Sequence, residues 1–473
     1  MEDDNINNKL SKYKIILDSV SPSFCVAKWK QVTIHLDTGR THSCHHPITH
    51  HIPVEELENN PSALHNTLHK KLLRKEMLAG SRPKECDYCW RVEDSSENSA
   101  IQAYSDRIVK SADSWARDYI DEIVKLPWDY DINPSSMEVN FGSTCNFKCS
   151  YCNPEVSSKW MEEIKAYGGY KLVNTTYNGL EWFKENNRIP IPTKDHNPYI
   201  DSFWKWWPDA VKDLKVFRIT GGEPLLNKNT FKVLDSLIAE PRPDLSFSIN
   251  SNLCVPKNLF NQFIEKITII QEKKAVKDFK LYTSCEAHGP RAEYIRFGLD
   301  YDQWLKNCET VIRDVPNSRL TVMATYNILS VTSFKLMLED LLALKNRYTI
   351  QPIRPHTVGI DIPYIRFPDF MTPWLIPSEW LKHIEDTVTW MYHNLQQTYW
   401  PPLCGKGFFD YEIKRLERVY IVCKEQLNNP KIAEDIKKHR QNFVSFTHEH
   451  DLRRGTDFIK TFPEFTEYLD QWR

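Results

Sequence analysis

From residue 137 onward, short apolar runs alternate with helical stretches, and this pattern constrains the fold of the 473-residue chain more than any other feature. The predicted strands are 137–142, 214–220, 245–250, 279–285, 319–326 and 356–365. Helical stretches such as NTFKVLDSLIAE and SFKLMLEDLLALKNRY lie between most of them. Such alternation predicts parallel strands joined by crossover helices. Six repeats are enough for a partial, TIM-like (β/α)6 barrel.

The remaining segments differ in character, so we expect an α/β protein with several parts. These are a lead-in (1–20), a small Cys-rich α+β module (21–100), a helical linker (101–136), the barrel core (137–370, with an insertion at about 168–210) and a helical C-terminal region (371–473). The run around Asp37-Thr38-Gly39 predicts a hairpin. We expect one helix over 61–80, ending at Gly80, and another over 100–125.

The insertion is rich in tryptophan and carries Trp182, Trp204, Trp206 and Trp207. Such side chains either pack in a core or line a substrate channel, and core packing is the simpler interpretation.

Composition narrows the class of protein. The formal net charge of −2 gives no global attraction to nucleic acid or acidic lipid. No run reaches the roughly 18–20 apolar residues of a membrane span, and the N-terminus lacks a signal pattern. We therefore expect a cytoplasmic protein, where thiols stay reduced. Its twelve cysteines then predict metal ligands or reactive thiols rather than disulfides.

Three cysteines lie on one short loop directly after the first strand of the core. Cys145, Cys149 and Cys152 form C-x3-C-x2-C within GSTCNFKCSYC. In a β/α barrel, loops at this end of the strands build the active site. Three thiolates can hold three corners of an iron–sulfur cube and leave one iron open, which suits catalysis. On spacing alone, a zinc site completed by a distant fourth ligand is the alternative.

A second motif, GGEP at Gly221–Pro224, directly follows the second strand. Its two glycines allow close approach of the backbone to a ligand, and the exposed backbone groups there could bind a charged amine. Alone, GGEP could be a tight turn capped by Glu223. Its position one strand away from the cysteine loop favours a ligand site.

With both motifs in this order, the chain resembles the radical SAM enzymes over roughly residues 137–370. The resemblance implies a 4Fe–4S cluster on Cys145, Cys149 and Cys152, with S-adenosylmethionine chelating the fourth iron. It implies reductive cleavage to a 5′-deoxyadenosyl radical that abstracts a substrate hydrogen. An external electron donor such as flavodoxin or ferredoxin is also implied.

The resemblance assigns further cofactor contacts. Tyr151 is similar to an aromatic residue that packs near the adenine. Gly221, Gly222, Glu223 and Pro224 resemble the segment that holds the methionine amine, largely through its backbone.

Three later motifs also match the family. Ser284 and Glu286, in TSCEAHGP, take the places of an S-x-D motif, with Glu replacing Asp. Arg296, in AEYIRFG, matches an arginine that binds the methionine carboxylate, where a planar guanidinium suits a bidentate contact. Its plain alternative is a surface arginine on a helix. Asn252, in INSNL, matches an asparagine near the cofactor.

The N-terminal cysteines form a second candidate site. Cys25, Cys44, Cys86 and Cys89 resemble the ligands of a twitch or SPASM-type module, which holds an auxiliary 4Fe–4S cluster. That module usually follows the barrel, whereas here it comes first. Related proteins often have two adjacent cysteines where this chain has Cys44-His45, so His45 could be a ligand.

Zinc is the alternative for this module, because four Cys/His ligands around a hairpin and a helix suit that ion. The local histidines favour it, although as single residues we expect them to be solvated loop positions: His42, His45, His46, His50 and His51. A module without metal is the third interpretation.

Other signals carry less weight. The isolated cysteines are expected to be small buried hydrophobes: Cys254, Cys285, Cys308, Cys404 and Cys423. Cys285, next to Ser284, could face the cavity. The HEH sequence at 448–450 lacks the spacing of a helical zinc site and is expected at the surface.

Two functions from different classes remain. The family analogy favours an enzyme that oxidises or cross-links a peptide or protein. The alternative is a non-catalytic scaffold that binds zinc or a cluster and uses its Trp-rich surface for a partner.

Overall fold

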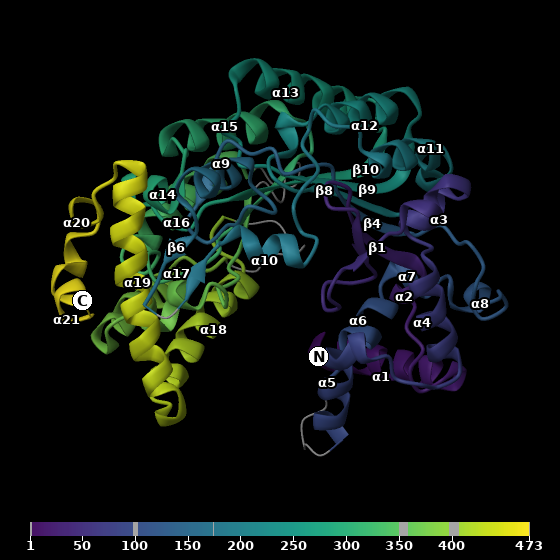
Figure 1. Cartoon of the computed structure of the whole chain (residues 1–473), viewed down its shortest axis with the longest axis horizontal. Coiled ribbons are helices and arrows are strands. Elements are labelled where there is room, and N and C mark those ends of the chain that lie inside the picture. Colours follow the sequence, from purple (N-terminus) through teal and green to yellow (C-terminus); the bar gives the residue numbers. More distant parts are fainter. Residues whose placement is uncertain (1, 98–102, 174, 350–357, 397–405, 473) are drawn as a thin grey trace. The chain divides into compact units, whose positions relative to one another are not determined.

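The structure is a computed structural model that describes residues 2–97, 103–173, 175–349, 358–396 and 406–472 (Figure 1). It has a mixed α/β fold with mostly parallel strands and many helices. The chain divides into two compact units, which are described separately below. Unit 1 consists of Met1–Gly142, Pro190–Gly221 and Arg242–Phe247; unit 2 consists of Ser143–Ile189, Gly222–Pro241 and Ser248–Arg473.

Unit 1 contains an antiparallel hairpin that continues into parallel strands. β1 (Gln31–His35) pairs antiparallel with β2 (Arg40–His42), and β2 pairs in turn with β3 (His50–His51). On its other side, β1 pairs parallel with β4 (Ser136–Asn140), which pairs parallel with β8 (Val216–Thr220). The predicted hairpin is therefore confirmed.

The hairpin turn depends on glycine. Gly39 has a φ of +61°, and a Cβ there would lie 2.1 Å from the Tyr199 ring. A side chain at this position would therefore combine backbone strain with a collision.

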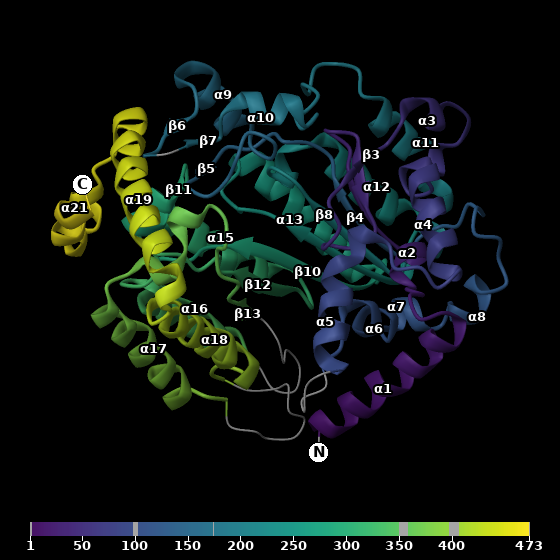
Figure 2. The ribbon, with the colours of Figure 1, turned by 60° about the horizontal axis from the view of Figure 1, so that its bottom comes forward.

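Helices surround these strands and build the core of unit 1. They include α1 (Glu2–Val20), α2 (Ala27–Lys30), α3 (Val54–Asn59), α4 (Leu68–Leu78), α5 (Asp87–Glu97) and α11 (Pro198–Asp213). Figure 2 shows α1 lying beside α6 (Asp106–Ser111). The shared core contains Leu17, Phe24, Trp29, Met77 and Trp90.

Two predicted helices of unit 1 differ from the structure. The helix expected over 61–80 is a 3-10 turn, η1 (Pro61–Leu64), followed by α4, because Thr67 caps α4 by accepting from Lys70 N–H. Gly80 follows α4 with a φ of +81°.

The single helix expected over 100–125 is wrong. The described part is three short helices: α6, α7 (Ser114–Arg117) and α8 (Ile120–Ile123). Polar side chains of this region bond to other segments: Ser111 Oγ accepts from Val26 N–H at 3.2 Å. Ser135 Oγ also donates to Trp115 O at 2.5 Å.

Unit 2 continues the strand–helix alternation. β9 (Arg242–Asn250) runs from unit 1 into unit 2, and β10 (Val276–Ser284), β12 (Arg319–Met323) and β13 (Val358–Asp361) follow as parallel neighbours. The predicted strands are thus confirmed, with the start of the last outside the described residues.

Crossover helices separate these strands. They are α12 (Lys228–Ala239), α13 (Lys257–Glu272), α15 (Tyr301–Asp314) and α16 (Phe334–Tyr348). Each contacts the next in a row, which can be followed in Figure 1. The parallel alternation is confirmed, whereas the partial barrel stays a prediction.

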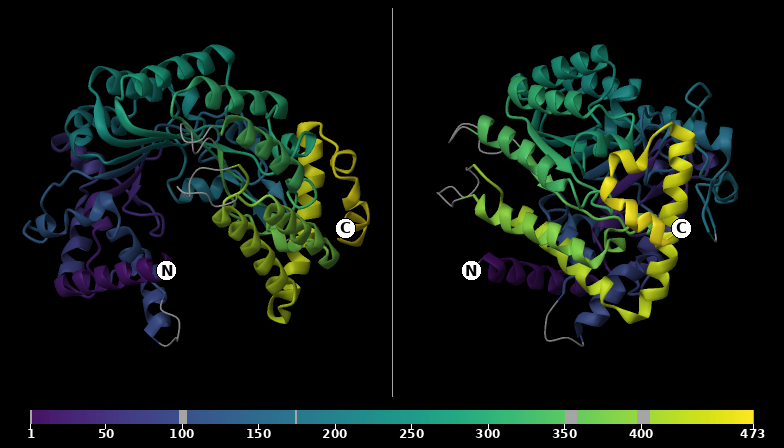
Figure 3. Two further views of the ribbon diagram at one scale, coloured as in Figure 1. Left: turned by 180° about the vertical axis from the view of Figure 1, so that it is seen from behind. Right: turned by 90° about the vertical axis from the view of Figure 1, so that its left-hand side faces the viewer.

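The C-terminal region is helical, as predicted. α17 (Leu381–His393) packs against α18 (Asp410–Leu427), and α19 (Ala433–Arg454) contacts both α20 (Phe458–Thr461) and α21 (Thr466–Trp472). Figure 3 shows α19 as the long helix near the C-terminus. Among the described residues, no helix combines the length and apolar character needed to cross a bilayer.

The tryptophans of the predicted insertion have two different environments. Trp206 and Trp207 of α11 are buried in unit 1, as the core interpretation predicts. Trp182 of α10 (Leu180–Glu185), in unit 2, is 54% exposed.

Candidate active site and cysteine cavity

The cysteine loop after β4 is fixed through its backbone by side chains from the following segments. Cys145 N–H donates to Ser158 Oγ at 3.1 Å, and the Trp160 indole donates to Cys149 O at 2.8 Å. The Tyr177 hydroxyl donates to Cys152 O at 2.9 Å, and the Asn178 amide does so at 2.8 Å. Ser158 and Trp160 lie on α9 (Ser158–Tyr167), Tyr177 lies in β7 (Thr176–Tyr177) and Asn178 directly follows it. The fold therefore sets the loop conformation while the three sulfurs remain free thiols.

The three thiols share an environment that disfavours unpaired negative charge. Burial raises the pKa of Cys145 to about 12 and also raises the pKa of Cys149 and of Cys152. The charge of Cys149 adds to the effect at both other sites. Thiolates in this loop therefore need a nearby cation, which a metal centre supplies.

Arg296 is a cationic side chain close to the Cys149 thiol. β11 (Arg296–Phe297) pairs antiparallel with β5 (Lys148–Cys149), which places Arg296 opposite Cys149. Arg296 Nη1 lies 3.6 Å from Cys149 Sγ, and the guanidinium lowers the pKa of that thiol against the larger effect of burial.

A buried carboxylate and a phenol hold this arginine. Arg296 Nε and Nη2 donate to Glu286 Oε2 at 2.9 and 2.7 Å, and Nη2 also contacts the Tyr151 hydroxyl. That hydroxyl donates to Glu286 Oε1 at 3.1 Å. Arg296 is only 6% exposed and immediately follows α14 (Pro290–Ile295). The interpretation of Arg296 as a surface residue on a helix is therefore wrong.

The GGEP segment approaches neighbouring backbone so closely that it requires glycine. Gly221 has a φ of +119°, and a Cβ there would lie 2.2 Å from Asn140 Oδ1. A Cβ on Gly222 would lie 2.5 Å from Thr144 O, in the cysteine loop. Glu223 N–H donates to that same oxygen at 2.8 Å.

The Glu223 side chain is buried and serves the local structure. Its carboxylate accepts from Leu225 N–H at 2.9 Å, Ser251 Oγ at 2.8 Å and Asn252 N–H at 2.6 Å. Burial raises the pKa of Glu223 to about 7, while these three donors act in the opposite direction. Pro224 begins the 3-10 turn η3 (Pro224–Leu226) and is buried.

Asn252 connects this segment to the cysteine loop. Its Nδ2 donates to Asn146 Oδ1 at 2.9 Å, and Asn146 Nδ2 donates to Cys254 O at 2.7 Å. Ser284 ends β10 and is half-buried, whereas Glu286 is buried. In unit 2, five residues thus contact the cysteine loop directly or through one intermediate residue: Tyr151, Glu223, Asn252, Glu286 and Arg296.

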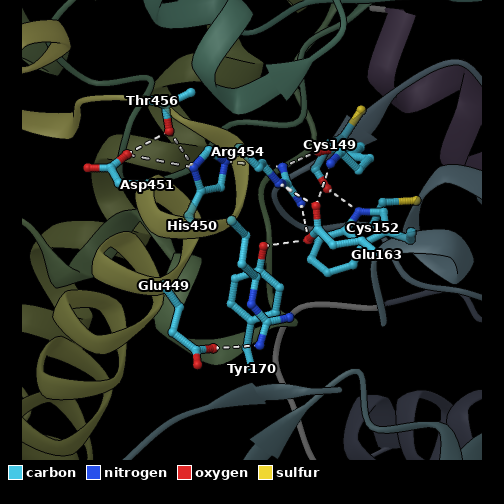
Figure 4. A network of polar contacts seen from close by, with 12 residues as sticks. Cys149, Cys152, Glu163, Tyr170, Glu449, His450, Asp451, Arg454 and Thr456 are labelled. Atoms are coloured by element: carbon cyan, nitrogen blue, oxygen red, sulfur yellow. Dashed lines mark hydrogen bonds and ion pairs between the residues drawn. The ribbon is translucent and has the colours of Figure 1, made fainter. Parts of the chain in front are cut away.

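Sequence reasoning missed a second arginine at this loop. Arg454, the last residue of α19, donates to Lys148 O at 2.6 Å and to both oxygens of Glu163 at 3.1 and 3.2 Å. Its guanidinium also lies 4.8 Å from the centre of the Trp160 ring. Figure 4 shows these contacts beside Cys149 and Cys152. No sequence motif marks this residue, which lies some 300 positions from the loop.

Helix α19 also carries the HEH sequence at 448–450, whose last residue does not lie at the surface as expected. His450 is buried, and its Nε2 lies 3.1 Å from Arg454 Nη1. Burial lowers the pKa of His450 to about 4, so the ring is neutral at neutral pH and can accept from the arginine. The surface interpretation is therefore wrong for this residue, because α19 turns it towards the protein interior.

A pocket of about 640 Å³ opens next to the cysteine loop within unit 2. Its lining includes Tyr177, Asn178, Trp182, Arg188 and Phe367. Tyr177 and Asn178 also hold Cys152 O, so the pocket wall and the loop share residues. Trp182 and Phe367 are 54% and 75% exposed, which leaves aromatic surface available to a ligand.

The four N-terminal cysteines line one small cavity of unit 1. Cys25, Cys44, Cys86 and Cys89 share it with the buried cations Lys28 and Arg107. His46, rather than the suggested ligand His45, lies in its wall.

Burial in this cavity disfavours an unpaired thiolate, whereas Lys28 and Arg107 act in the opposite direction on the pKa of Cys25. Burial raises the pKa of Cys86 and of Cys89 to about 12. The two buried cations would stabilise the negative charge of a thiolate-ligated metal centre.

A single zinc ion requires a particular spacing of its ligand atoms. With Zn–S bonds near 2.3 Å, tetrahedral geometry brings the sulfurs to about 3.8 Å from one another. Within the described ranges, the only group of three or more His, Cys, Asp or Glu ligand atoms all within 4.8 Å of one another is His50, His69 and Glu85. No cysteine of either set belongs to that group.

Most isolated cysteines behave as predicted. Cys285, Cys308 and Cys423 are buried, and Cys254 is half-buried. Cys285 Sγ contacts Ala287 O at 3.2 Å. Cys404 lies outside the described residues.

Comparisons with known proteins add little. No family model matches the chain, and no curated protein matches it. One similar solved structure is that of Streptococcus suis SuiB bound to the precursor peptide SuiA. The likeness has 12% identity and a TM-score of 0.31, and it covers 77% of this chain and 69% of that one. At so low a score the function must be argued from this chain's own residues.

Proposed function

We propose that the chain is a radical SAM enzyme. The observation that carries the proposal is the convergence of its motifs within unit 2. Thr144 O accepts from Glu223, and Asn252 links Glu223 to Asn146. On the other side, Arg296 joins Cys149 to Glu286 and Tyr151. Segments spread over about 150 residues thus surround one three-cysteine loop.

Each part of this arrangement has a proposed role. Cys145, Cys149 and Cys152 would hold three irons of a 4Fe–4S cluster and leave the fourth open. When bound, that cluster supplies the electron that cleaves S-adenosylmethionine to methionine and a 5′-deoxyadenosyl radical. Gly221 and Gly222 allow the GGEP backbone to pass close to the loop, where it would bind the methionine amine.

Arg296 is the proposed contact for the methionine carboxylate. Glu286 and Tyr151 fix its guanidinium through Nε and Nη2, while Nη1 is directed at Cys149. In this arrangement Glu286 acts as a positioning residue, because it orients the arginine. A carboxylate is well suited to that task, which explains how Glu can replace Asp in this motif.

The wider assignment follows from the same proposal. A partial (β/α)6 barrel over 137–370 would carry the radical chemistry, with flavodoxin or ferredoxin as the external donor. The module at 21–100 would hold an auxiliary 4Fe–4S cluster on Cys25, Cys44, Cys86 and Cys89. Lys28 and Arg107 support this part of the proposal, because they offset the charge of four thiolates.

The proposed substrate class is a peptide or protein. The pocket beside Cys152 supports this choice, since a volume of about 640 Å³ lies in the usual range for ligand sites. Its exposed aromatic side chains, Trp182 and Phe367, would pack against an apolar or aromatic side chain of the substrate.

The test is formation of 5′-deoxyadenosine by the anaerobically reconstituted chain with a chemical reductant. We expect the wild-type chain and the control Cys423→Ala to form it, and Cys149→Ala to form none. Cys423 is a buried cysteine of α18, so the control matches the chemistry of the change. Equal product from Cys149→Ala, or none from the wild type with its cluster in place, would contradict the proposal.

A further inference from the structure

Unit 1 brings two histidines and a glutamate together next to the cysteine cavity. His50 comes from β3, His69 from the first turn of α4, and Glu85 from the 3-10 turn η2 (Lys84–Cys86). One ligand atom of each lies within 4.8 Å of the other two. The two imidazole rings have their centres 4.3 Å apart, and His69 Nε2 lies 3.0 Å from Glu85 Oε2.

We propose that His50, His69 and Glu85 form a binding site for a divalent transition-metal ion, with zinc as the best match. Two imidazoles and one carboxylate are a ligand set that zinc accepts at three positions of a tetrahedron, with water at the fourth. Iron(II) also uses this set, whereas magnesium and calcium prefer oxygen ligands alone. The proposal does not depend on the radical chemistry.

Outer contacts orient two of the three ligands. His50 Nε2 lies 2.9 Å from Thr67 Oγ1, so this nitrogen has a partner and Nδ1 remains for the metal. Lys28 Nζ binds Glu85 Oε1, which leaves Oε2 on the side of His69. Metal-binding residues commonly have such second partners, which fix the ring or carboxylate that touches the ion.

The positive charges around the three ligands limit which metal ions the site can bind. Lys28 contacts Glu85, and the buried Lys70 bonds Gln31 O at 3.0 Å and His65 Nδ1 at 2.7 Å. These cations repel a metal ion, so binding depends on direct ligation by the imidazole nitrogens, which suit zinc. This requirement again favours zinc over hard cations.

An ion here would tie three separate segments together. β3 follows the loop that carries Cys44, η2 ends at Cys86, and α4 precedes both Cys86 and Cys89. The metal would therefore fix the spacing of segments that carry cysteines of the adjacent cavity. Its role is structural, like that of a clip.

The test is titration of the full-length, cluster-reconstituted chain with Co²⁺ as a spectroscopic substitute for zinc. We expect one ion to bind per chain with absorption of nitrogen and oxygen ligation and without a thiolate-to-cobalt charge-transfer band. His69→Ala should weaken binding at least about 100-fold, since loss of an outer contact alone typically costs about 10- to 100-fold. Glu85→Gln should act in the same direction.

His51→Ala is the matched control, because His51 is the exposed neighbour of His50 in β3. It should bind cobalt like the wild type. The His69 side chain is 48% exposed, so its removal leaves the core intact. Zinc should also raise the unfolding temperature of the wild type but not of His69→Ala. Absence of binding, a thiolate band, or unchanged binding in His69→Ala would overturn the proposal.

Discussion

The cysteine loop of unit 2 and the cysteine cavity of unit 1 both place cations beside half-buried or buried thiols, yet they are built in different ways. The loop places three cysteines within eight residues and leaves their positioning to Trp160, Tyr177, Asn178 and Arg454. The cavity collects four cysteines from separate segments and places Lys28 and Arg107 in its wall.

This difference teaches how the number of ligands relates to the work that a site can do. Four ligands from different segments close a cluster, which suits electron transfer and structural roles. In the proposed function, three ligands on one loop would leave an open position for a second molecule, and Arg296, oriented by Glu286, would contact its carboxylate. The comparison predicts one open and one closed cluster in the same chain.

The largest expected effect comes from removing one cysteine from each set. We expect the wild-type chain to hold about eight irons, and both Cys149→Ala and Cys86→Ala to hold about four. Only Cys149→Ala should lose formation of 5′-deoxyadenosine, because the proposal assigns cofactor cleavage to the loop cysteines. Iron and sulfide analysis with product chromatography measures both quantities.

Zinc content completes that experiment. Any zinc that persists in Cys86→Ala but disappears in His69→Ala belongs to the histidine site rather than to the cavity. Zinc in place of iron at the cavity would break the comparison, since unit 1 would then carry no cluster.

The two buried arginines give the next largest effect. Arg296→Met leaves Glu286 buried without its partner, and Arg107→Met does the same to Glu93, so each should destabilise the chain by about 3–5 kcal/mol. Under conditions where both variants stay folded, only Arg296→Met should lose cofactor cleavage. Urea unfolding and product formation measure the two properties.

A double variant separates stability from chemistry. Replacing Arg296 and Glu286 together by Met should recover most of the lost stability, because no unpaired charge remains buried. Cofactor cleavage should stay absent. Restored cleavage in the double variant would remove Arg296 from the proposed binding site.

The two sites also differ in how far the sequence could predict them. Cys145, Cys149 and Cys152 are close in sequence, so their spacing alone predicts a shared site. Arg454 reaches the same loop from α19, and nothing in its surroundings in the sequence marks it. Likewise, His69 and Glu85 lie far enough from His50 that only the packing of β3, α4 and η2 reveals the group.

In the fold, too, some features could be predicted from the sequence and others could not. Periodic apolar runs predicted the parallel strands and their crossover helices, because each element repeats over many residues. The helix expected over 100–125 is divided into α6, α7 and α8 despite its helical composition, and Trp115 O in α7 accepts from Ser135 Oγ, a distant side chain. The surface alternative for Arg296 stayed open in the sequence because β11 is only two residues long.

The pH dependence of stability tests how Arg454 supports the cysteine loop through its ion pair with Glu163. Burial raises the pKa of Glu163, but Arg454 and Lys148 outweigh it and lower the pKa from 4.5 to about 2. Glu163 therefore stabilises the fold fully above its unfolded pKa, and this contribution disappears as the pH falls towards 2. Glu163→Gln should lose about 3 kcal/mol near neutral pH, and the difference from wild type should close in acid.

Urea unfolding across this pH range measures the difference. Glu162→Gln is the matched control on the same helix, because Glu162 is exposed and pairs only with Lys159 among the contacts described. It should unfold like the wild type at each pH. A constant gap between Glu163→Gln and wild type would show that the charge of Glu163 is not what supports the loop.

The smallest expected effect concerns the pocket beside Cys152. Trp182→Ala should raise the KM for a peptide substrate about tenfold, equivalent to about 1.4 kcal/mol, with little change in kcat. Cleavage of the cofactor without substrate should not change. Tyr130→Ala, an exposed aromatic of unit 1, is the control. An altered kcat with constant KM would place Trp182 in the chemistry rather than in substrate binding.

The contrast between an open and a closed cluster is tested most directly by electron paramagnetic resonance of the reduced chain with and without S-adenosylmethionine. Cys86→Ala keeps the loop cluster, and we predict that its signal changes when the cofactor is added. Cys149→Ala keeps the cavity cluster, and we predict an unchanged signal. A loop cluster that ignores the cofactor, or a cavity cluster that responds to it, would contradict the account.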